Sequence, residues 1–196
     1  MSDFIANRQN TCGVILAGGQ GRRMNYEDKG LLNWKGKMLI EYVIDSLQPQ
    51  LSKLVISANQ HHDQYQQLGY PVISDQIENF QGPLAGIYSA MQHCSESDYL
   101  LILPCDCPTP PNDLFARLSD ALASSENKNI AIVDDGQRTQ PLFGLYKTSL
   151  LPALQTALQQ NHNKVMQFID DNATVTVDYS DQAEAFRNFN RPEDMQ

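Results

Sequence analysis

Short apolar runs alternate with amphipathic stretches along most of the chain. Buried strands are predicted at 12–17, 53–59, 71–74, 98–106, 130–135, 141–147 and 173–179. Helices are predicted between them, at 39–48, 61–67, 84–94, 111–125, 149–160 and 164–170. Continuous apolar strands that alternate with helices are typical of a mostly parallel sheet with helices on both faces. The pattern therefore predicts an α/β fold with a three-layer, doubly wound, mostly parallel sheet.

The alternation continues to the end of the chain without a long linker or repeat. Residues 1–196 are therefore expected to form a single domain, with 1–11 as a disordered N-terminal tail. At the start of the helix at 111–125, Asn112 or Asp113 is positioned to cap the first turn.

Glycines and polar residues directly follow several predicted strands. They are Gly18 and Gly19, Ser57 and Asn59, Asp75, and Asp106. In open α/β sheets, ligands bind beyond the carboxyl ends of the strands. The sequence therefore predicts that the functional site lies at this edge of the sheet.

The charge balance limits the partners of the chain. It has 14 Lys and Arg against 23 Asp and Glu, a net charge of −9. Non-specific binding to a nucleic-acid backbone needs a cationic face, so no nucleic-acid partner is expected. No apolar run has the length of a membrane span, and the first ten residues lack a signal-peptide core. We therefore expect a cytoplasmic protein without a membrane partner.

Four cysteines are present, at 12, 94, 105 and 107, and none forms a C-x-x-C pair. Cys12 and Cys105 lie in apolar strand-like runs, where reduced, buried thiols are expected. A nucleophilic Cys107 would need a nearby histidine, and the sequence does not show one.

The stretch GVILAGGQGRRM at 13–24 contains a glycine-rich loop after a predicted strand. A dinucleotide fingerprint would require glycine where Met24 stands. A P-loop ending at Gly36 and Lys37 would require glycine in place of Leu31 and serine or threonine in place of Met38. Both templates are therefore excluded.

Positive charge gathers around this loop. Residues 20–37 contain five basic and two acidic residues, a local charge of +3 on an acidic chain. Gly18 and Gly19 allow backbone N–H groups to approach phosphates, and Arg23 and Lys29 are candidates to neutralise phosphate charge. A solvated basic loop would explain the charge but not the glycine pair. Arg22 is the weaker candidate of the two adjacent arginines, because one of them is expected to face solvent.

Asp106 ends the apolar run LILPCD. Mg²⁺ binds through one or two carboxylates together with substrate phosphates and water, so a single strand-end carboxylate suits it. The alternative is a helix cap, a role that Thr109 or Asn112 could also fill.

The motifs LAGG, RRM, DKGLL, GPLAGI, PCD and NFNRPED occur in this order between residue 12 and about residue 194. Together they resemble the motifs of molybdenum cofactor guanylyltransferases, within the nucleotidyltransferase superfamily. The resemblance implies a Rossmann-like nucleotidyltransferase fold, GTP and molybdenum-bound molybdopterin as substrates, and Mg²⁺ as cofactor. Molybdoenzyme-maturation proteins are the further partners that it implies.

The resemblance also assigns roles to residues at matching positions. Its nucleotide-binding positions are Leu16, Ala17, Gly18, Gly19, Lys29, Asn59, Asp75 and Asp106. Its catalytic positions are Arg23, Lys29 and Asp106, with Asp106 as the metal ligand, and its pterin-side positions are Gly82, Pro83, Asn188 and Asn190. From the residues alone, Asp75 is as readily a turn aspartate and Asn190 a helix cap. Ser57 departs from the asparagine that is frequent in the family.

The expected reaction is the transfer of GMP from GTP to the phosphate of molybdenum-bound molybdopterin, with release of pyrophosphate. One alternative is cytidylyl or other nucleotidyl transfer to molybdopterin or to a sugar or polyol phosphate. Another is a non-catalytic module that binds nucleotide and delivers cofactor. The catalytic hypothesis makes one structural demand: Asp106 must lie close to Gly18 and Lys29.

Overall fold

The computed structural model describes residues 5–18, 28–76, 82–189 and 194. Its centre is a seven-stranded sheet with the order β5-β4-β1-β6-β8-β7-β9. The strands are β1 (Thr11–Leu16), β4 (Lys53–Ser57), β5 (Val72–Ile73), β6 (Tyr99–Pro104), β7 (Ile130–Asp134), β8 (Thr139–Lys147) and β9 (Thr174–Asp178). A separate two-stranded antiparallel sheet pairs β2 (Asn33–Trp34) with β3 (Lys37–Met38).

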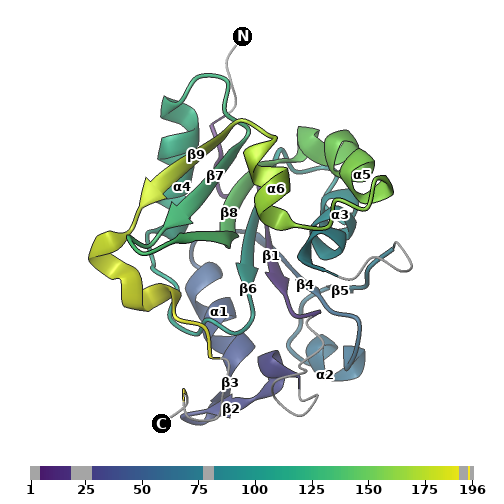
Figure 1. The fold of residues 1–196 in the computed structure, drawn as a ribbon. Coiled ribbons are helices and arrows are strands. Elements are labelled where there is room, and N and C mark those ends of the chain that lie inside the picture. The colour runs from purple at the N-terminus through teal and green to yellow at the C-terminus, as the bar shows by residue number, and fades with distance from the viewer. Residues whose placement is uncertain (1–4, 19–27, 77–81, 190–193, 195–196) are drawn as a thin grey trace.

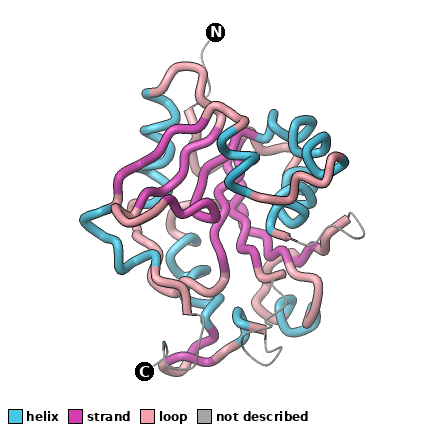
Figure 2. The backbone as a smooth tube through the Cα atoms, viewed as in Figure 1, coloured by secondary structure: helices cyan, strands magenta, loops and turns pink. Residues whose placement is uncertain are grey.

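Most neighbouring strands of the large sheet are parallel, as predicted. Parallel pairing joins β5, β4, β1 and β6 and also joins β7 to β9. Only β8 runs antiparallel to both of its neighbours, β6 and β7. Figure 2 shows these strands side by side at the centre, with the helices outside them.

Helices cover both faces of the sheet, which confirms the predicted three layers (Figure 1). The α-helices are α1 (Leu39–Leu47), α2 (His62–Gln66), α3 (Pro83–His93), α4 (Leu114–Ser124), α5 (Leu151–Gln159) and α6 (Val165–Asp170). Short 3₁₀ helices are η2 (Lys29–Leu31), η3 (Thr148–Leu150) and η4 (Ser180–Phe186). None of the helices in the described part of the chain is long and apolar enough to cross a membrane.

Alternating side chains of the central strands supply two separate cores. Ile15 and Leu101 face one side of the sheet, where α1 and α4 pack. Val14 and Leu100 face the other side, where α3, α5 and α6 pack. Because both strand faces are buried, β1 and β6 read as continuous apolar runs rather than as alternating patterns.

Two expectations about chain ends and caps are wrong. Residues 5–11 do not form a disordered tail, because Ala6 is buried in the core and its carbonyl accepts a hydrogen bond from the Ser119 hydroxyl. Asp113 occupies the N-cap position of α4, but its side chain makes no capping hydrogen bond. Instead, Gln50 Oε1 accepts a hydrogen bond from the N–H of Phe115 at 3.1 Å. A cap from a distant segment leaves no local sequence signal.

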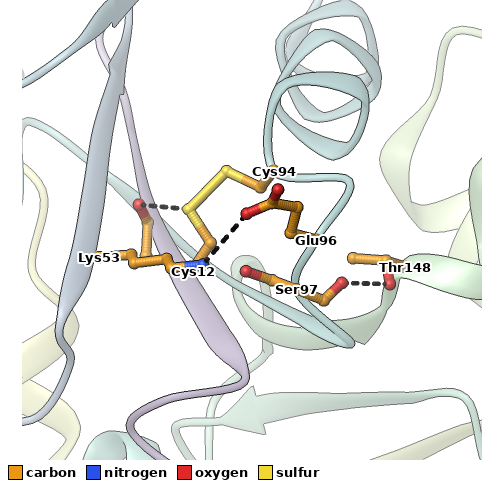
Figure 3. The surroundings of a disulfide bond; sticks show 7 residues. Cys12, Lys53, Cys94, Glu96, Ser97 and Thr148 are labelled. Atoms are coloured by element: carbon orange, nitrogen blue, oxygen red, sulfur yellow. Dashed lines mark hydrogen bonds and ion pairs between the residues drawn. A yellow bond between two sulfur atoms is a disulfide. The ribbon is translucent and has the colours of Figure 1, made fainter.

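The cysteine prediction is wrong for Cys12. Cys12 on β1 and Cys94 after α3 form a disulfide, with their Cα atoms 6.3 Å apart (Figure 3). Beside it lie the Lys53–Glu96 ion pair and Ser97, whose carbonyl accepts a hydrogen bond from Thr148. The two residues are 82 positions apart in sequence, and only the packing of α3 on the sheet brings them together.

Thiol counting tests this bond. Cys105 and Cys107 are the free cysteines, so denatured, unreduced protein should react with a thiol reagent at two sites and reduced protein at four. A Cys94→Ser control frees Cys12 and should give three sites before and after reduction. Four reactive thiols in unreduced wild-type protein would contradict the disulfide.

Candidate active site

The carboxyl ends of β1, β4 and β6 converge at one edge of the sheet. Beyond the paired strands, the Ala17 N–H donates to the Ser57 carbonyl at 2.8 Å, and the Cys105 N–H donates to the Leu16 carbonyl at 3.1 Å. These bonds hold three segments in register: the LAG segment at 16–18, the end of β4, and the start of the PCD turn at 104–106. In Figure 1, the strand arrows of β1 and β6 point toward the end of the molecule that carries α2, β2 and β3.

Lys29 and Asp106 form an ion pair at this edge. Lys29 Nζ lies 2.8 Å from Asp106 Oδ2, and the two side chains are 24% and 12% exposed. A charge-assisted hydrogen bond at this distance is stronger than one between neutral groups. The structure therefore brings together two of the three predicted catalytic residues, from segments far apart in the sequence.

Asp28 fixes the turn that carries Lys29. Its carboxylate accepts hydrogen bonds from the N–H of Gly30, at 3.2 Å, and from the Tyr65 hydroxyl of α2. Burial raises the pKa of Asp28, although these two hydrogen bonds oppose the shift. Burial also raises the pKa of Tyr65, so its hydroxyl keeps its proton and remains a donor.

Gly30 allows this turn to lie against the PCD segment. A Cβ at this position would lie 2.5 Å from the Tyr65 hydroxyl oxygen and 3.4 Å from both Cβ and Sγ of Cys105. Tyr65 and Cys105 are themselves buried, so neither has free space into which to move. The glycine of the DKG motif is therefore a packing requirement for the Lys29–Asp106 contact.

Gly18, Asn59 and Asp75 form a second group at the same edge. Asn59 Nδ2 donates to Asp75 Oδ2 at 2.8 Å, and the Asp75 N–H donates to Asn59 Oδ1 at 2.9 Å. A Cβ on Gly18 would lie 3.3 Å from Asn59 Nδ2. Burial raises the pKa of Asp75, and the Asn59 hydrogen bond opposes this shift. These three of the predicted nucleotide-binding residues are thus neighbours.

Helix α3 approaches this second group through a glycine. A Cβ on Gly86 would lie 2.9 Å from Ser57 Oγ, 3.2 Å from Leu16 Cδ2 and 3.6 Å from Asp75 Oδ1. Ser57 is buried beneath the helix. Gly82 is the N-cap residue of α3 and Pro83 is its first residue, one turn before Gly86. The start of α3 therefore lies next to the predicted nucleotide-binding residues.

The predicted pterin-side residue Asn188 directly precedes Phe189, which is hydrogen-bonded to Asp106. The N–H of Phe189 donates to the Asp106 carbonyl at 2.8 Å. Within the described ranges, the buried Asn188 Oδ1 has no hydrogen-bond partner. Gly19, Arg22, Arg23 and Asn190 lie outside the described residues, so their predicted roles stay predictions.

Cys107 is not suited to act as a nucleophile. Burial raises its pKa to about 12, and its thiol donates to the Ala185 carbonyl at 3.0 Å. Burial raises the pKa of the Cys105 thiol as well. Thiols of this kind stay protonated near neutral pH and are unreactive.

Sequence reasoning missed the supporting residues of the site. Asp28 and Gly30 lie inside the DKG motif, and Gly86 lies inside GPLAG, so the motifs gave the available signal. Tyr65 carries no such signal, because it reaches Asp28 only after α2 has packed beside η2.

The donor set fits one carboxylate ligand for a divalent cation. Within the described ranges, three or more histidine, cysteine, aspartate and glutamate side chains are nowhere grouped as a metal centre. Mg²⁺ in phosphate-transfer sites is often held by one or two carboxylates, with phosphates and water completing the coordination. Asp106, nearly buried and at the strand end, has the chemistry for that position.

The fold, with this group of residues at the carboxyl ends of its strands, is that of a nucleotidyltransferase, as comparison with known proteins shows. Residues 13–175 match the family model described as the MobA-like NTP transferase domain. The molybdenum cofactor guanylyltransferase of Pasteurella multocida is 43% identical over 93% of this chain and 96% of its own length. The protein of that name from Photobacterium profundum is 41% identical, over 98% and 97%. The chain therefore belongs to the molybdenum cofactor guanylyltransferase family.

Solved structures show the same fold. Molybdopterin-guanine dinucleotide biosynthesis protein A from Archaeoglobus fulgidus superposes with a TM-score of 0.76 at 22% identity, over 94% of each chain. A nucleotidyl transferase from Methanothermobacter superposes with a TM-score of 0.72 at 16% identity, over 94% of this chain and 93% of that one. These likenesses establish the Rossmann-like nucleotidyltransferase architecture.

The packing at Gly30 can be tested by a double-mutant cycle. Gly30→Ala should lower the free energy of unfolding by about 1–3 kcal/mol, because its Cβ collides with the Tyr65 hydroxyl. Tyr65→Phe removes that hydroxyl, so the double variant should lose less stability than the two single losses combined. Urea unfolding of the four proteins measures this, and strictly additive losses would contradict the proposed collision.

Proposed function

We propose that this chain transfers GMP from GTP to the terminal phosphate of molybdenum-bound molybdopterin and releases pyrophosphate. The observation that carries the proposal is the Lys29–Asp106 ion pair at the carboxyl ends of β1 and β6, close to the LAG segment. The pair sets the Lys29 ammonium group, for which we propose phosphate binding, beside the Asp106 carboxylate, for which we propose Mg²⁺ binding. Relatives at 43% and 41% identity bear the name of this activity.

The proposed reaction needs no side-chain nucleophile. An anionic phosphate oxygen of the acceptor attacks the α-phosphorus of GTP, and the bond from that phosphorus to the bridging oxygen breaks. Pyrophosphate leaves with the electron pair of that bond. Because the acceptor oxygen is already deprotonated near neutral pH, the protein mainly positions the two phosphates and stabilises charge. The protonated, buried thiols of Cys105 and Cys107 are consistent with this.

In this proposal, each group at the edge has a separate task. Gly18 presents backbone to the phosphates without a side chain, and Lys29 donates to phosphate oxygens. Asn59 and Asp75 contact the nucleoside, with Asp75 oriented by two hydrogen bonds, one donated by Asn59 Nδ2 and one accepted by Asn59 Oδ1. Asp106 would hold Mg²⁺, which when bound neutralises phosphate charge. Arg23 is proposed as a second phosphate-binding cation, and Asn188 and Asn190 as acceptor-side residues.

The substrates can be tested by pyrophosphate release. The protein is supplied with GTP, CTP, ATP or UTP and Mg²⁺, with and without molybdenum-loaded molybdopterin. The proposal expects release with GTP and the acceptor together, and little release when either is omitted. Preference for CTP would instead support cytidylyl transfer, and GTP binding without product would support a delivery module.

Asp106→Asn should lower turnover by about 10²- to 10³-fold, because a neutral amide is a weaker ligand for Mg²⁺ than a carboxylate and cannot form the ion pair with Lys29. The matched control is Asp45→Asn, which removes the carboxylate of an exposed Lys37–Asp45 pair of similar length, 2.7 Å. That control should keep wild-type turnover. Near-wild-type turnover by Asp106→Asn, measured with Mg²⁺, would remove Asp106 from the metal role.

Lys29→Ala should act mainly on the nucleotide. Removing the ammonium group leaves phosphate charge uncompensated, so the KM for GTP should rise more than the KM for the acceptor. Steady-state kinetics with each substrate varied in turn separate the two effects. Unchanged kinetics toward GTP would contradict the proposed contact.

A further inference from the structure

Trp34 lies outside every motif that the resemblance uses, yet it contacts the segment next to Asp106. It is the only tryptophan in the chain. It pairs with Lys37 across the two-stranded β2–β3 ribbon, whose turn residues Lys35 and Gly36 have φ of 49° and 91°. Both residues of the turn thus adopt the left-handed conformation typical of a tight hairpin.

Residues close to Trp34 in the sequence contact it and hold its ring. The Tyr42 hydroxyl of α1 donates to the Trp34 carbonyl at 2.8 Å, and the two ring centroids are 5.1 Å apart. Lys35 Nζ lies 4.4 Å from the Trp34 ring centroid. These contacts hold the indole independently of its contact with the C-terminal segment.

On another side, the Trp34 ring meets Phe189. Their centroids are 5.0 Å apart and their planes are inclined by 83°, an edge-to-face arrangement. Figure 1 shows the C-terminal segment returning to the end of the molecule where β2 and β3 lie. The contact therefore joins the hairpin to the last part of the chain.

Phe189 links this contact to the site. Its backbone N–H donates to the Asp106 carbonyl, and its neighbour along the chain is Asn188. The short segment of Asn188 and Phe189 is thus held by Trp34 through a ring and by Asp106 through the backbone. Of these two contacts, the one with Asp106 lies at the predicted active site, and the one with Trp34 lies outside it.

Two buried polar atoms of this group have no partner among the described residues. They are Trp34 Nε1, a donor, and Asn188 Oδ1, an acceptor. A buried polar atom without a partner costs about 1–3 kcal/mol, so such atoms are uncommon unless a ligand or water satisfies them. A donor and an acceptor of this kind in one group of residues suit a polar heterocycle as the ligand.

We infer that Trp34 is a positioning residue for the acceptor: through Phe189 it holds Asn188 beside Asp106. This inference rests on the proposed function, in which Asn188 faces the pterin. Among the described residues, the Trp34 ring contacts Lys35, Tyr42 and Phe189, and Phe189 is hydrogen-bonded to Asp106, so Trp34 acts on the acceptor side rather than on the GTP side.

The positioning can be tested without any substrate. Hydrogen exchange at the Phe189 amide reports its bond to the Asp106 carbonyl. Trp34→Ala should speed this exchange by about 3- to 10-fold, whereas Trp34→Phe keeps an aromatic ring and should restore most of the protection. Unchanged exchange at Phe189 in Trp34→Ala would overturn the inference.

The functional consequence is tested by kinetics. Trp34→Ala should raise the KM for molybdenum-loaded molybdopterin by about 3- to 10-fold and leave the KM for GTP unchanged. The matched control is Phe143→Leu, which removes a core edge-to-face pair with the same 5.0 Å separation. It should lower stability without a selective rise in the acceptor KM. Equal rises for both substrates, or a selective rise in the control, would overturn the inference.

These outcomes separate the inference from the proposed function. If wild-type protein forms no product from GTP and the acceptor, the proposed function fails, and the acceptor role of Trp34 fails with it. If wild-type protein is active but Trp34→Ala keeps the wild-type acceptor KM, the inference alone fails. The inference stands only if both the Phe189 exchange and the acceptor KM respond to Trp34→Ala.

Discussion

The contact between Lys29 and Asp106 is the constraint on which the rest of the site depends. It joins a turn that follows the LAG segment to the end of β6, across the sheet edge where β1 and β6 run parallel. Holding a lysine and an aspartate together in a partly buried place requires support from neighbouring groups, because desolvation of two charges is unfavourable. Asp28 and Tyr65 supply part of that support by fixing the turn, and Gly30 supplies the space for its approach to Cys105.

Close packing permitted by a glycine also occurs next to the predicted nucleotide-binding residues. Gly86 lets α3 pack against Ser57 and Leu16, as Gly30 lets η2 pack against the PCD turn. In both places, the missing Cβ allows two elements to approach closely. The neighbouring polar side chains are Lys29 beside Gly30 and Asp75 beside Gly86. Gly30 of DKG and Gly86 of GPLAG are therefore explained by contacts between elements rather than by unusual backbone angles, since neither of these two residues has a positive φ.

The sequence was sufficient to predict what depends on local patterns. Buried strands such as β1 and β6 are continuous apolar runs, and their carboxyl ends could be located because parallel strands share a direction. Features that depend on distant packing were missed. The Cys12–Cys94 disulfide, the Gln50 cap on α4 and the Trp34–Phe189 contact all join positions that become neighbours only in the folded chain. The antiparallel direction of β8 likewise lacks a local signal, because a strand buried on both faces looks alike in either direction.

A double-mutant cycle on kcat/KM between Lys29 and Asp106 tests the central claim most directly. If the two side chains work as one unit, the loss in Lys29→Ala/Asp106→Asn should be much smaller than the product of the two single losses. If instead the losses multiply, the two residues act independently, and their ion pair does not organise the site.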